Sequence, residues 1–249
     1  MKLYDYQREI IESNENKIMM NWARCNGKTY TIANYIKEKR PKEVLWANFA
    51  NKLNNLQEKF NELLHMDDEF KNSLSSFKLS NQEIYFKYHD GSYTKIKLLN
   101  RHELKDFYQY EIKKKVDLIV YDDCYPFDTG YVADKIICSI TENNYDKHLQ
   151  QSYPDFFISE KDYRTALDVG LMTNEIIQRI KEENPEQFLK EFAILDSLYG
   201  DSFVDLNLFV TKTIRQLIYE YERIPSANNT VLTRKNIIEM IKTLKELNN

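Results

Sequence analysis

A continuous apolar run at residues 118–121, Leu-Ile-Val-Tyr, restricts the possible folds of this chain more than any other stretch. Strands of an antiparallel sheet with one solvated face alternate apolar and polar residues, whereas parallel strands covered on both faces stay apolar throughout. The run ends in two acids, Asp122 and Asp123. Open α/β sheets bind ligands at the carboxyl ends of their parallel strands. The stretch therefore indicates a buried parallel strand that ends at a binding site.

A second apolar stretch, at residues 18–23, leads into Gly27-Lys28-Thr29, and residues 27–40 are expected to form a helix. A Gly-Lys-Thr turn between a strand and a helix is typical of a phosphate-binding loop, because backbone N–H groups at the helix N-terminus face the anion. Lys28 would reach the β- and γ-phosphates, and the Thr29 hydroxyl would hold Mg²⁺. The usual motif begins with a glycine, and here that position holds Trp22.

Each of these signals has a simpler interpretation when it is taken alone. The turn could be an ordinary capped helix start with a solvated lysine, and two acids at a strand end could merely cap a loop. Their combination favours a nucleotide site. Asp122 would then hold Mg²⁺ through its water shell, and Asp123 would orient or deprotonate the attacking water.

Tyr6 and Gln7 precede the loop in an expected N-terminal helix. A glutamine side chain can pair with N6 and N7 of adenine, and an aromatic ring can stack on the base. The pair is a candidate adenine site, although two exposed residues on a surface helix would look the same.

The order of expected elements predicts an α/β domain with a mostly parallel sheet flanked by helices. It comprises a short helix near residues 4–14, a strand and helix at 17–40, a strand at 43–50, a helix at 51–66, a hairpin around Asp90-Gly91, and strands from Val116 and Ala133. From Glu160 onward the chain is expected to be helical. We predict a boundary near residue 150, between a domain at 1–150 and an α-helical C-terminal region at 151–249.

Composition excludes several classes of protein. A net charge of −4 does not suggest a nucleic-acid binder, although a local basic face remains compatible with it. Three widely spaced cysteines indicate neither a disulfide framework nor a zinc site. The N-terminus has no apolar leader, and no run is long enough to cross a membrane, so a cytoplasmic protein is expected.

The stretches YDYQ, RCNGKT and LIVYDD together resemble the ATPase domain of phage large terminases, the motors that package DNA. Those enzymes have a deviant phosphate loop with an arginine three residues before the glycine, as Arg24 precedes Gly27. The resemblance spans about residues 1–205 and implies a P-loop NTPase of the RecA/terminase type, using ATP and Mg²⁺. It assigns the phosphates to Arg24, Cys25, Asn26, Gly27, Lys28 and Thr29, and catalysis to Arg24, Lys28 and Asp123.

The resemblance also implies a coupling motif at Ser139 and Thr141, which would sense the γ-phosphate. The implied partners are double-stranded DNA and a portal protein, a small terminase or a separate nuclease subunit, with a homo-oligomeric ring as the active form and no membrane. The family's acidic pair is usually Asp-Glu, which puts the role of Asp123 in doubt. The coupling motif is only loosely matched, and the residues after Phe203 show no pattern of the family's C-terminal nuclease.

Two alternatives remain open. A helicase-like DNA translocase shares the Tyr-Gln pair, the Gly-Lys-Thr turn and the acidic strand, but it normally needs a second RecA-like domain. A nucleotide-binding or catalytically impaired assembly protein would use the same fold to hold a partner.

Overall fold

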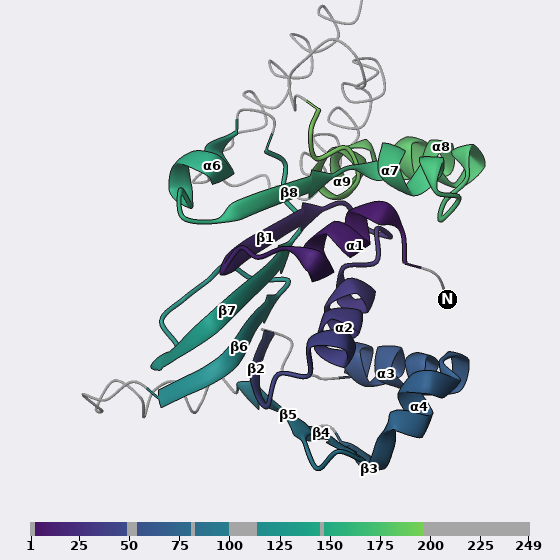
Figure 1. Ribbon diagram of the computed structural model, residues 1–249. Helices are drawn as coiled ribbons and strands as arrows, with labels where there is room; N and C mark the ends of the chain where they lie inside the picture. The colour runs from purple at the N-terminus through teal and green to yellow at the C-terminus, as the bar shows by residue number, and fades with distance from the viewer. Residues whose placement is uncertain (1–2, 49–53, 81–82, 100–113, 145–146, 197–249) are drawn as a thin grey trace, which may run out of the picture.

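The computed structural model describes residues 3–48, 54–80, 83–99, 114–144 and 147–196. Its centre is an eight-stranded sheet with the order β3-β4-β5-β2-β6-β7-β1-β8 (Figure 1). The strands are β1 (Lys17–Trp22), β2 (Glu43–Asn48), β3 (Leu74–Leu79), β4 (Glu83–Tyr88), β5 (Tyr93–Leu99), β6 (Lys114–Asp122), β7 (Tyr131–Ile140) and β8 (Phe157–Lys161).

Six strands, from β5 through β8 in the sheet order, are parallel to their neighbours, and β3, β4 and β5 form an antiparallel meander. The mostly parallel α/β fold predicted from the sequence is confirmed. In the register of β6 and β7, Asp122 lies opposite Ser139. The carboxyl ends of β1, β6 and β7 therefore meet at one edge of the sheet, where ligand sites are expected.

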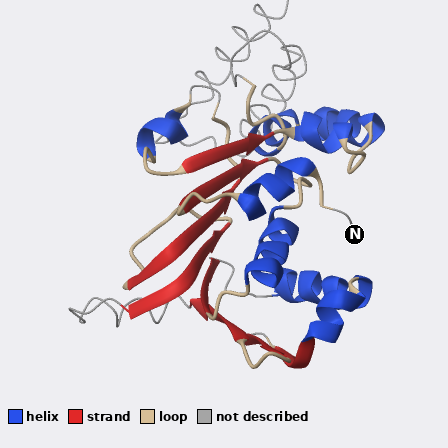
Figure 2. Cartoon of the chain, in the orientation of Figure 1, coloured by secondary structure: helices blue, strands red, loops and turns tan. Residues whose placement is uncertain are grey.

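Helices cover the sheet and continue beyond one edge of it (Figure 2). They are α1 (Asp5–Glu12), α2 (Lys28–Lys39), α3 (Asn54–Met66), α4 (Asp68–Ser73), α6 (His148–Ser152), α7 (Tyr163–Asp168), α8 (Asn174–Glu183) and α9 (Pro185–Glu191). One apolar core lies between the sheet and α1–α4, and a second lies on the opposite face of the sheet. No helix in the described part of the chain is both long and apolar enough to cross a membrane.

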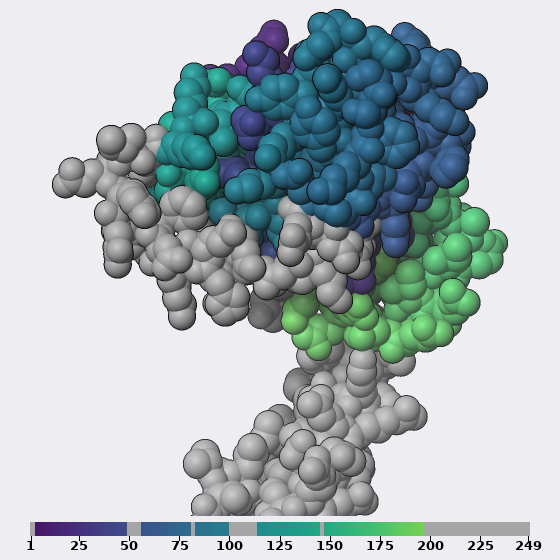
Figure 3. Space-filling view, turned by 90° about the horizontal axis from the view of Figure 1, so that it is seen from below, coloured from purple at the N-terminus to yellow at the C-terminus, as the bar shows by residue number. Residues whose placement is uncertain are grey.

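The C-terminal helices form a lobe with a separate core. Buried side chains of α7–α9 and of the turns beside them form a cluster of their own, among them Tyr163, Met172, Ile177, Phe188 and Phe192. In the space-filling view this lobe, drawn in green, projects beside the surface of the hairpin and of α3 and α4, drawn in blue (Figure 3). The lobe follows β8 directly, so it is attached at the edge of the sheet next to β1.

The structure corrects two details of the expected element order. β8 pairs in parallel with β1, so the sheet continues past residue 150 and the chain is not purely helical from Glu160 onward. Within the region expected to be helical, residues 163–183 form two helices, α7 and α8, separated by a turn in which Gly170 has φ +74°. The division into two domains stays a prediction, and the expected helical region from residue 197 onward lies outside the described residues.

Candidate active site

The loop between β1 and α2 turns sharply at two residues with left-handed backbone. Cys25 has φ 67° and Gly27 has φ 76°. Trp22, where the usual motif has glycine, still belongs to β1 and is fully buried, with its indole N–H donating to Ser159 Oγ at 3.1 Å. The bend therefore begins after Trp22, and this loop does not need a glycine at that position.

Gly27 occupies a position that only glycine fits without strain. Its φ is positive, and a Cβ atom added there would lie 2.6 Å from Gln7 Nε2. Positive φ costs an L-residue with a side chain about 1–2 kcal/mol even where space is free. Backbone geometry and packing thus both favour glycine at the start of α2.

Lys28 begins α2 and folds back onto the ends of the neighbouring strands. Its ammonium donates to the carbonyl oxygen of Trp22 at 2.8 Å and to Thr141 Oγ1 at 2.5 Å. Burial lowers the pKa of Lys28, while the nearby carboxylates of Asp123 and Asp122 act in the opposite direction. The lysine therefore lies at the predicted site, held by β1 and β7.

The two acids at the end of β6 have different environments. Asp122 is 4% exposed, and its carboxylate accepts hydrogen bonds from Ser139 Oγ at 2.9 Å and from Asn48 Nδ2 at 3.2 Å. Burial and then the neighbouring Asp123 raise the pKa of Asp122. Asp123 is exposed, with φ 52°, and it lines the cavity described below. One acid is thus fixed behind the site, and the other projects into it.

Arg24 lies at the mouth of the loop and contacts the C-terminal lobe. Its Nε is 2.7 Å from Glu191 Oε2, and its backbone N–H donates to the carbonyl oxygen of Glu191 at 2.9 Å. Glu191 is the last residue of α9. The arginine singled out in the sequence therefore joins the loop to a helix that no sequence motif had connected with it.

Asn26 ties the centre of the loop to the end of β8. Its side-chain Nδ2 lies within 3.0–3.4 Å of the carbonyl oxygens of Ala23, Lys161 and Asp162. Its Oδ1 has no hydrogen-bond partner within the described part of the protein, although the residue is fully buried. Asn26 is thus a structural part of the loop, and its side chain is turned inward.

Ser139 and Thr141, the candidate coupling residues, contact different parts of the site. Ser139 is fully buried and donates to Asp122 Oδ1, whereas Thr141 accepts from Lys28 and donates to the Trp22 carbonyl oxygen at 3.0 Å. Thr141 lines the cavity and Ser139 does not. Each therefore contacts one predicted catalytic or metal-binding residue directly.

The candidate adenine residues are turned toward the loop. The Tyr6 hydroxyl and Gln7 Nε2 both donate to the carbonyl oxygen of Asn26, at 3.0 Å and 3.3 Å. Tyr6 lies edge-on to Trp22 in the core, with ring centroids 5.0 Å apart, and burial raises its pKa to about 12. Gln7 borders the cavity but Tyr6 does not.

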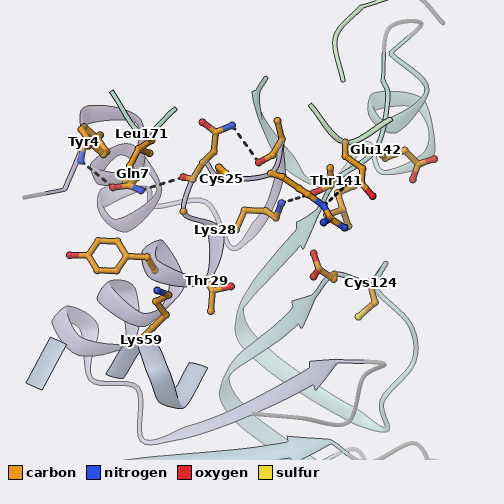
Figure 4. A pocket seen from close by; sticks show the side chains of 18 of the residues that line it. Tyr4, Gln7, Cys25, Lys28, Thr29, Lys59, Cys124, Thr141, Glu142 and Leu171 are labelled. Carbon is orange, nitrogen blue, oxygen red and sulfur yellow. Dashed lines mark hydrogen bonds and ion pairs between the residues drawn. The ribbon is translucent and has the colours of Figure 1, made fainter. Parts of the chain in front are cut away.

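A cavity of about 740 Å³ lies over the loop (Figure 4). Its volume is in the range of sites that bind small ligands and cofactors. The predicted residues that line it are Gln7, Arg24, Cys25, Asn26, Gly27, Lys28, Thr29, Asp123 and Thr141. Several other lining residues belong to none of the predicted site residues: Tyr4, Lys59 and Glu62 of α3, Glu142, Leu171 and Glu191.

A metal ion would need oxygen ligands beyond those of the protein. In the described part of the chain, no group of three or more His, Cys, Asp or Glu side chains could hold a metal ion. The hydroxyl of Thr29 and the carboxylate of Asp122 nevertheless flank the loop, and Mg²⁺ usually takes one or two protein ligands, several waters and phosphate oxygens. This set of donors fits Mg²⁺ that enters together with a nucleotide.

Solved structures of phage large terminases share this fold. The ATPase domain of the Thermus phage P74-26 large terminase superposes with a TM-score of 0.54 and 14% identity, covering 82% of this chain and 94% of that domain. A single-residue variant of that domain superposes with a TM-score of 0.55 and 15% identity, covering 78% of this chain and 94% of the variant. The HK97 bacteriophage large terminase gives 0.55 and 11%, covering 87% of this chain and 54% of that protein.

Sequence comparison adds nothing to this structural likeness, because no protein-family model and no curated protein matches the chain. The resemblance to the terminase ATPase fold inferred from YDYQ, RCNGKT and LIVYDD is confirmed at the level of the fold. At 11–15% identity, that likeness describes the fold and leaves the chemistry to the residues of the site.

Proposed function

We propose that this chain is an ATP-hydrolysing motor subunit of the terminase type, which drives translocation of double-stranded viral DNA. One observation carries the proposal: Lys28, Thr29 and Asp123 line a single cavity at the carboxyl ends of parallel strands. These are the three residue types that phosphoryl transfer requires, for phosphate charge, for the metal ion and for the attacking water. The terminase ATPase fold supports the same reading.

Phosphoryl transfer depends mainly on positioning and on stabilisation of charge. The backbone N–H groups at the start of α2 and the ammonium of Lys28 would neutralise the phosphates. Lys28 is held by the carbonyl oxygen of Trp22 and the hydroxyl of Thr141. Nucleotide would exchange these contacts for phosphate oxygens, and Thr141 would lose its lysine partner. That exchange gives Thr141 a way to respond to the bound phosphate.

Mg²⁺ would be held by Thr29 directly and by Asp122 through water. When bound, Mg²⁺ would supply positive charge that neutralises the negative charge developing on the phosphates. The carboxylate of Asp122 is oriented by Ser139 and Asn48. Hydrogen bonds of this kind fix a carboxylate and are a usual second layer around metal sites. Ser139 therefore serves here as a positioning residue for the metal ligand.

Asp123 is the group available to orient or deprotonate the attacking water. Its left-handed backbone directs an exposed carboxylate to the cavity beside the buried Asp122. Backbone conformations of this kind cost energy and concentrate at functional sites. The side chain is one methylene shorter than the glutamate usual at this place, and the same observation favours the second candidate, an assembly protein that binds nucleotide and hydrolyses it poorly.

The DNA substrate, the oligomeric ring and the partner proteins enter the proposal only through the resemblance to large terminases. A motor of this type would act on double-stranded DNA as a homo-oligomeric ring, with a portal protein, a small terminase or a separate nuclease subunit as partners, in the host cytoplasm. A helicase-like translocase is less favoured, because the described residues contain one sheet only. Weak hydrolysis by the isolated chain is compatible with a motor that depends on its neighbours.

The test is ATP hydrolysis with and without double-stranded DNA, for wild type, Lys28→Ala and Asp123→Asn. We expect Lys28→Ala to lose nucleotide binding and Asp123→Asn to keep binding while turnover falls by at least about 10²-fold. Binding without hydrolysis in wild type, even with portal and DNA present, would favour the assembly protein. Absence of any nucleotide binding would refute the proposal altogether.

A further inference from the structure

Gln7 is held between its own helix and the phosphate loop. Its Oε1 accepts the backbone N–H of Tyr4 at 3.1 Å, and its Nε2 donates to the carbonyl oxygen of Asn26 at 3.3 Å. Only 2% of Gln7 is exposed. Both ends of the amide therefore have protein partners, and almost none of its surface is open to a ligand.

The contacts of Gln7 brace the loop at its tightest point. A Cβ atom at Gly27 would lie 2.6 Å from Gln7 Nε2, so the amide packs directly against the loop. The Tyr6 hydroxyl binds the same Asn26 carbonyl oxygen, and the Asn26 side chain binds the end of β8 from the other side. The peptide before Gly27 is thus fixed from two directions, as a preformed phosphate loop requires.

A residue that reads adenine needs an open hydrogen-bonding edge. Recognition of N6 and N7 by glutamine uses the amide oxygen and nitrogen together. Because only 2% of Gln7 is exposed, its remaining hydrogen-bonding capacity is largely closed to the cavity, and the ring of Tyr6 lies in the core against Trp22. The Tyr-Gln pair is therefore suited to positioning the loop and poorly suited to reading a base.

Two further side chains, those of Tyr4 and Leu171, line the cavity near Gln7 (Figure 4). Tyr4 precedes α1, and its ring stacks on Tyr6 with centroids 6.0 Å apart and an angle of 2° between the rings. Leu171 comes from the turn between α7 and α8 and is 40% exposed. Both line the cavity, and Figure 4 shows them together beside Gln7.

Resting on the nucleotide site proposed above, we propose that Tyr4 and Leu171 hold the base by apolar contact, without hydrogen-bonded readout. Gln7 is then a positioning residue of the phosphate loop. The substrate class is accordingly nucleoside triphosphates without strong selection of the base, GTP as well as ATP. Sites that hydrogen-bond a substrate group can reject an analogue lacking it by about 10⁴-fold, whereas apolar pockets discriminate far less between similar shapes.

The test is equilibrium binding of ATP, GTP and inorganic tripolyphosphate, each with Mg²⁺, to the full chain by calorimetry. Tripolyphosphate has no base, so it reports on the loop alone. For wild type we expect ATP and GTP to differ by less than about tenfold. Leu171→Ala should weaken both nucleotides by about fivefold and leave tripolyphosphate unchanged. Gln7→Met should weaken all three ligands by the same factor.

A matched control separates the base contact from a general loss of apolar surface. Ile176 of α8 is 38% exposed, nearly the same fraction as Leu171, but it does not line the cavity. Ile176→Ala should therefore change the binding of none of the three ligands. If circular dichroism shows that Gln7→Met does not fold, two measurements still test the proposal. They are the ratio of the wild-type affinities for ATP and GTP, and the effect of Leu171→Ala on nucleotide binding.

Distinct results would overturn the two proposals. A preference for ATP over GTP of 100-fold or more, as an order of magnitude for hydrogen-bonded readout, would refute the inference about the base while the nucleotide site stands. Loss of that preference in Gln7→Met with tripolyphosphate binding intact would identify Gln7 as the reader. If wild type binds none of the three ligands, the nucleotide site itself is wrong, and the inference about the base fails with it.

Discussion

Arg24 of the phosphate loop and Glu191 at the end of α9 are joined twice, through an ion pair of 2.7 Å and a backbone hydrogen bond of 2.9 Å. Glu191 Oε2 also accepts Gln187 Nε2 at 2.9 Å, which holds the carboxylate in place. Since the guanidinium is engaged by the lobe, nucleotide must compete with Glu191 for it. The state of the loop and the position of the lobe are therefore physically linked.

The first prediction is that Glu191→Gln tightens nucleotide binding. Removing the carboxylate charge frees the guanidinium for phosphate, but the Arg24 side chain is 58% exposed, so solvent already weakens the pair. Exposed ion pairs contribute about 0.2–1 kcal/mol, which corresponds to at most about fivefold in affinity. Calorimetric titration with ATP and Mg²⁺ measures it. Lys190→Gln is the control, because Lys190 pairs with Glu186 on the same helix. Weaker binding in Glu191→Gln would contradict competition.

The second prediction concerns Arg24 itself. If its guanidinium stabilises charge on the γ-phosphate, Arg24→Ala should lower the rate of ATP hydrolysis by about 10³-fold or more. Arg24→Lys should recover little, because a lysine lacks the planar fork that binds phosphate through two bonds. Steady-state phosphate release measures both. A higher KM with an unchanged kcat would show that Arg24 serves binding alone.

The third prediction links stability to the buried acid. Burial raises the pKa of Asp122, so the folded state binds a proton more readily than the unfolded chain. Stability from this group is greatest below the ordinary carboxyl pKa and falls as pH rises through the raised pKa. Asp122→Asn removes that penalty and keeps a side-chain oxygen for Ser139.

We therefore expect Asp122→Asn to have a higher Tm than wild type at pH 7, by about 2–4 °C, the shift that 1 kcal/mol gives in a chain of this size. At about pH 3.5, where the carboxyl is protonated in both states, the difference should shrink. Differential scanning calorimetry across this range measures it. ATP turnover should be lost at the same time. A variant less stable than wild type at neutral pH would show that the Asn48 contact outweighs the burial of the charge.

Local chemistry explains which parts of this fold could be predicted from the sequence. The run at 118–121 and the turn at Gly27 each reflect a constraint carried by neighbouring residues, so strand, loop and acids were located correctly. β8 was missed because it is an edge strand with a half-buried pattern, Phe-Ile-Ser-Glu-Lys, and lacks a continuous apolar run. β3, at the other edge, has four exposed residues and was missed for the same reason.

The cavity residues outside the motifs depend on contacts between distant parts of the chain. Leu171 and Glu191 reach the loop only because β8 carries the lobe to the side of β1, and no local pattern encodes that placement. The burial of Tyr6, in contrast, follows from a local sequence pattern. Tyr6 lies four residues before Ile10 on the apolar side of α1, so helical periodicity alone places it in the core.

The fourth prediction tests whether the short acid limits hydrolysis. Asp123→Glu restores the methylene that the family's acidic pair usually has, although glutamate adopts φ 52° less readily than aspartate does. If reach is limiting, turnover should rise by about tenfold, a part of the roughly 10²–10⁴-fold that a well-placed general base contributes. Asp122→Glu is the matched control and should abolish activity, because the buried carboxylate has no room to lengthen. Lower activity in Asp123→Glu would mean that the site is shaped for aspartate.

The fifth prediction separates backbone strain from loop packing with two glycines. Gly27 and Gly91 both have positive φ, at 76° and 85°, but a Cβ atom meets Gln7 at 2.6 Å in the first and nothing within 4 Å in the second. Gly91→Ala should cost about 1–2 kcal/mol of stability through strain alone and leave nucleotide binding intact. Gly27→Ala should lose binding of ATP and of tripolyphosphate, because relieving the clash displaces Gln7 from the loop. Urea denaturation and calorimetric titration measure the two effects, and tripolyphosphate binding preserved in Gly27→Ala would show that the loop does not depend on this contact.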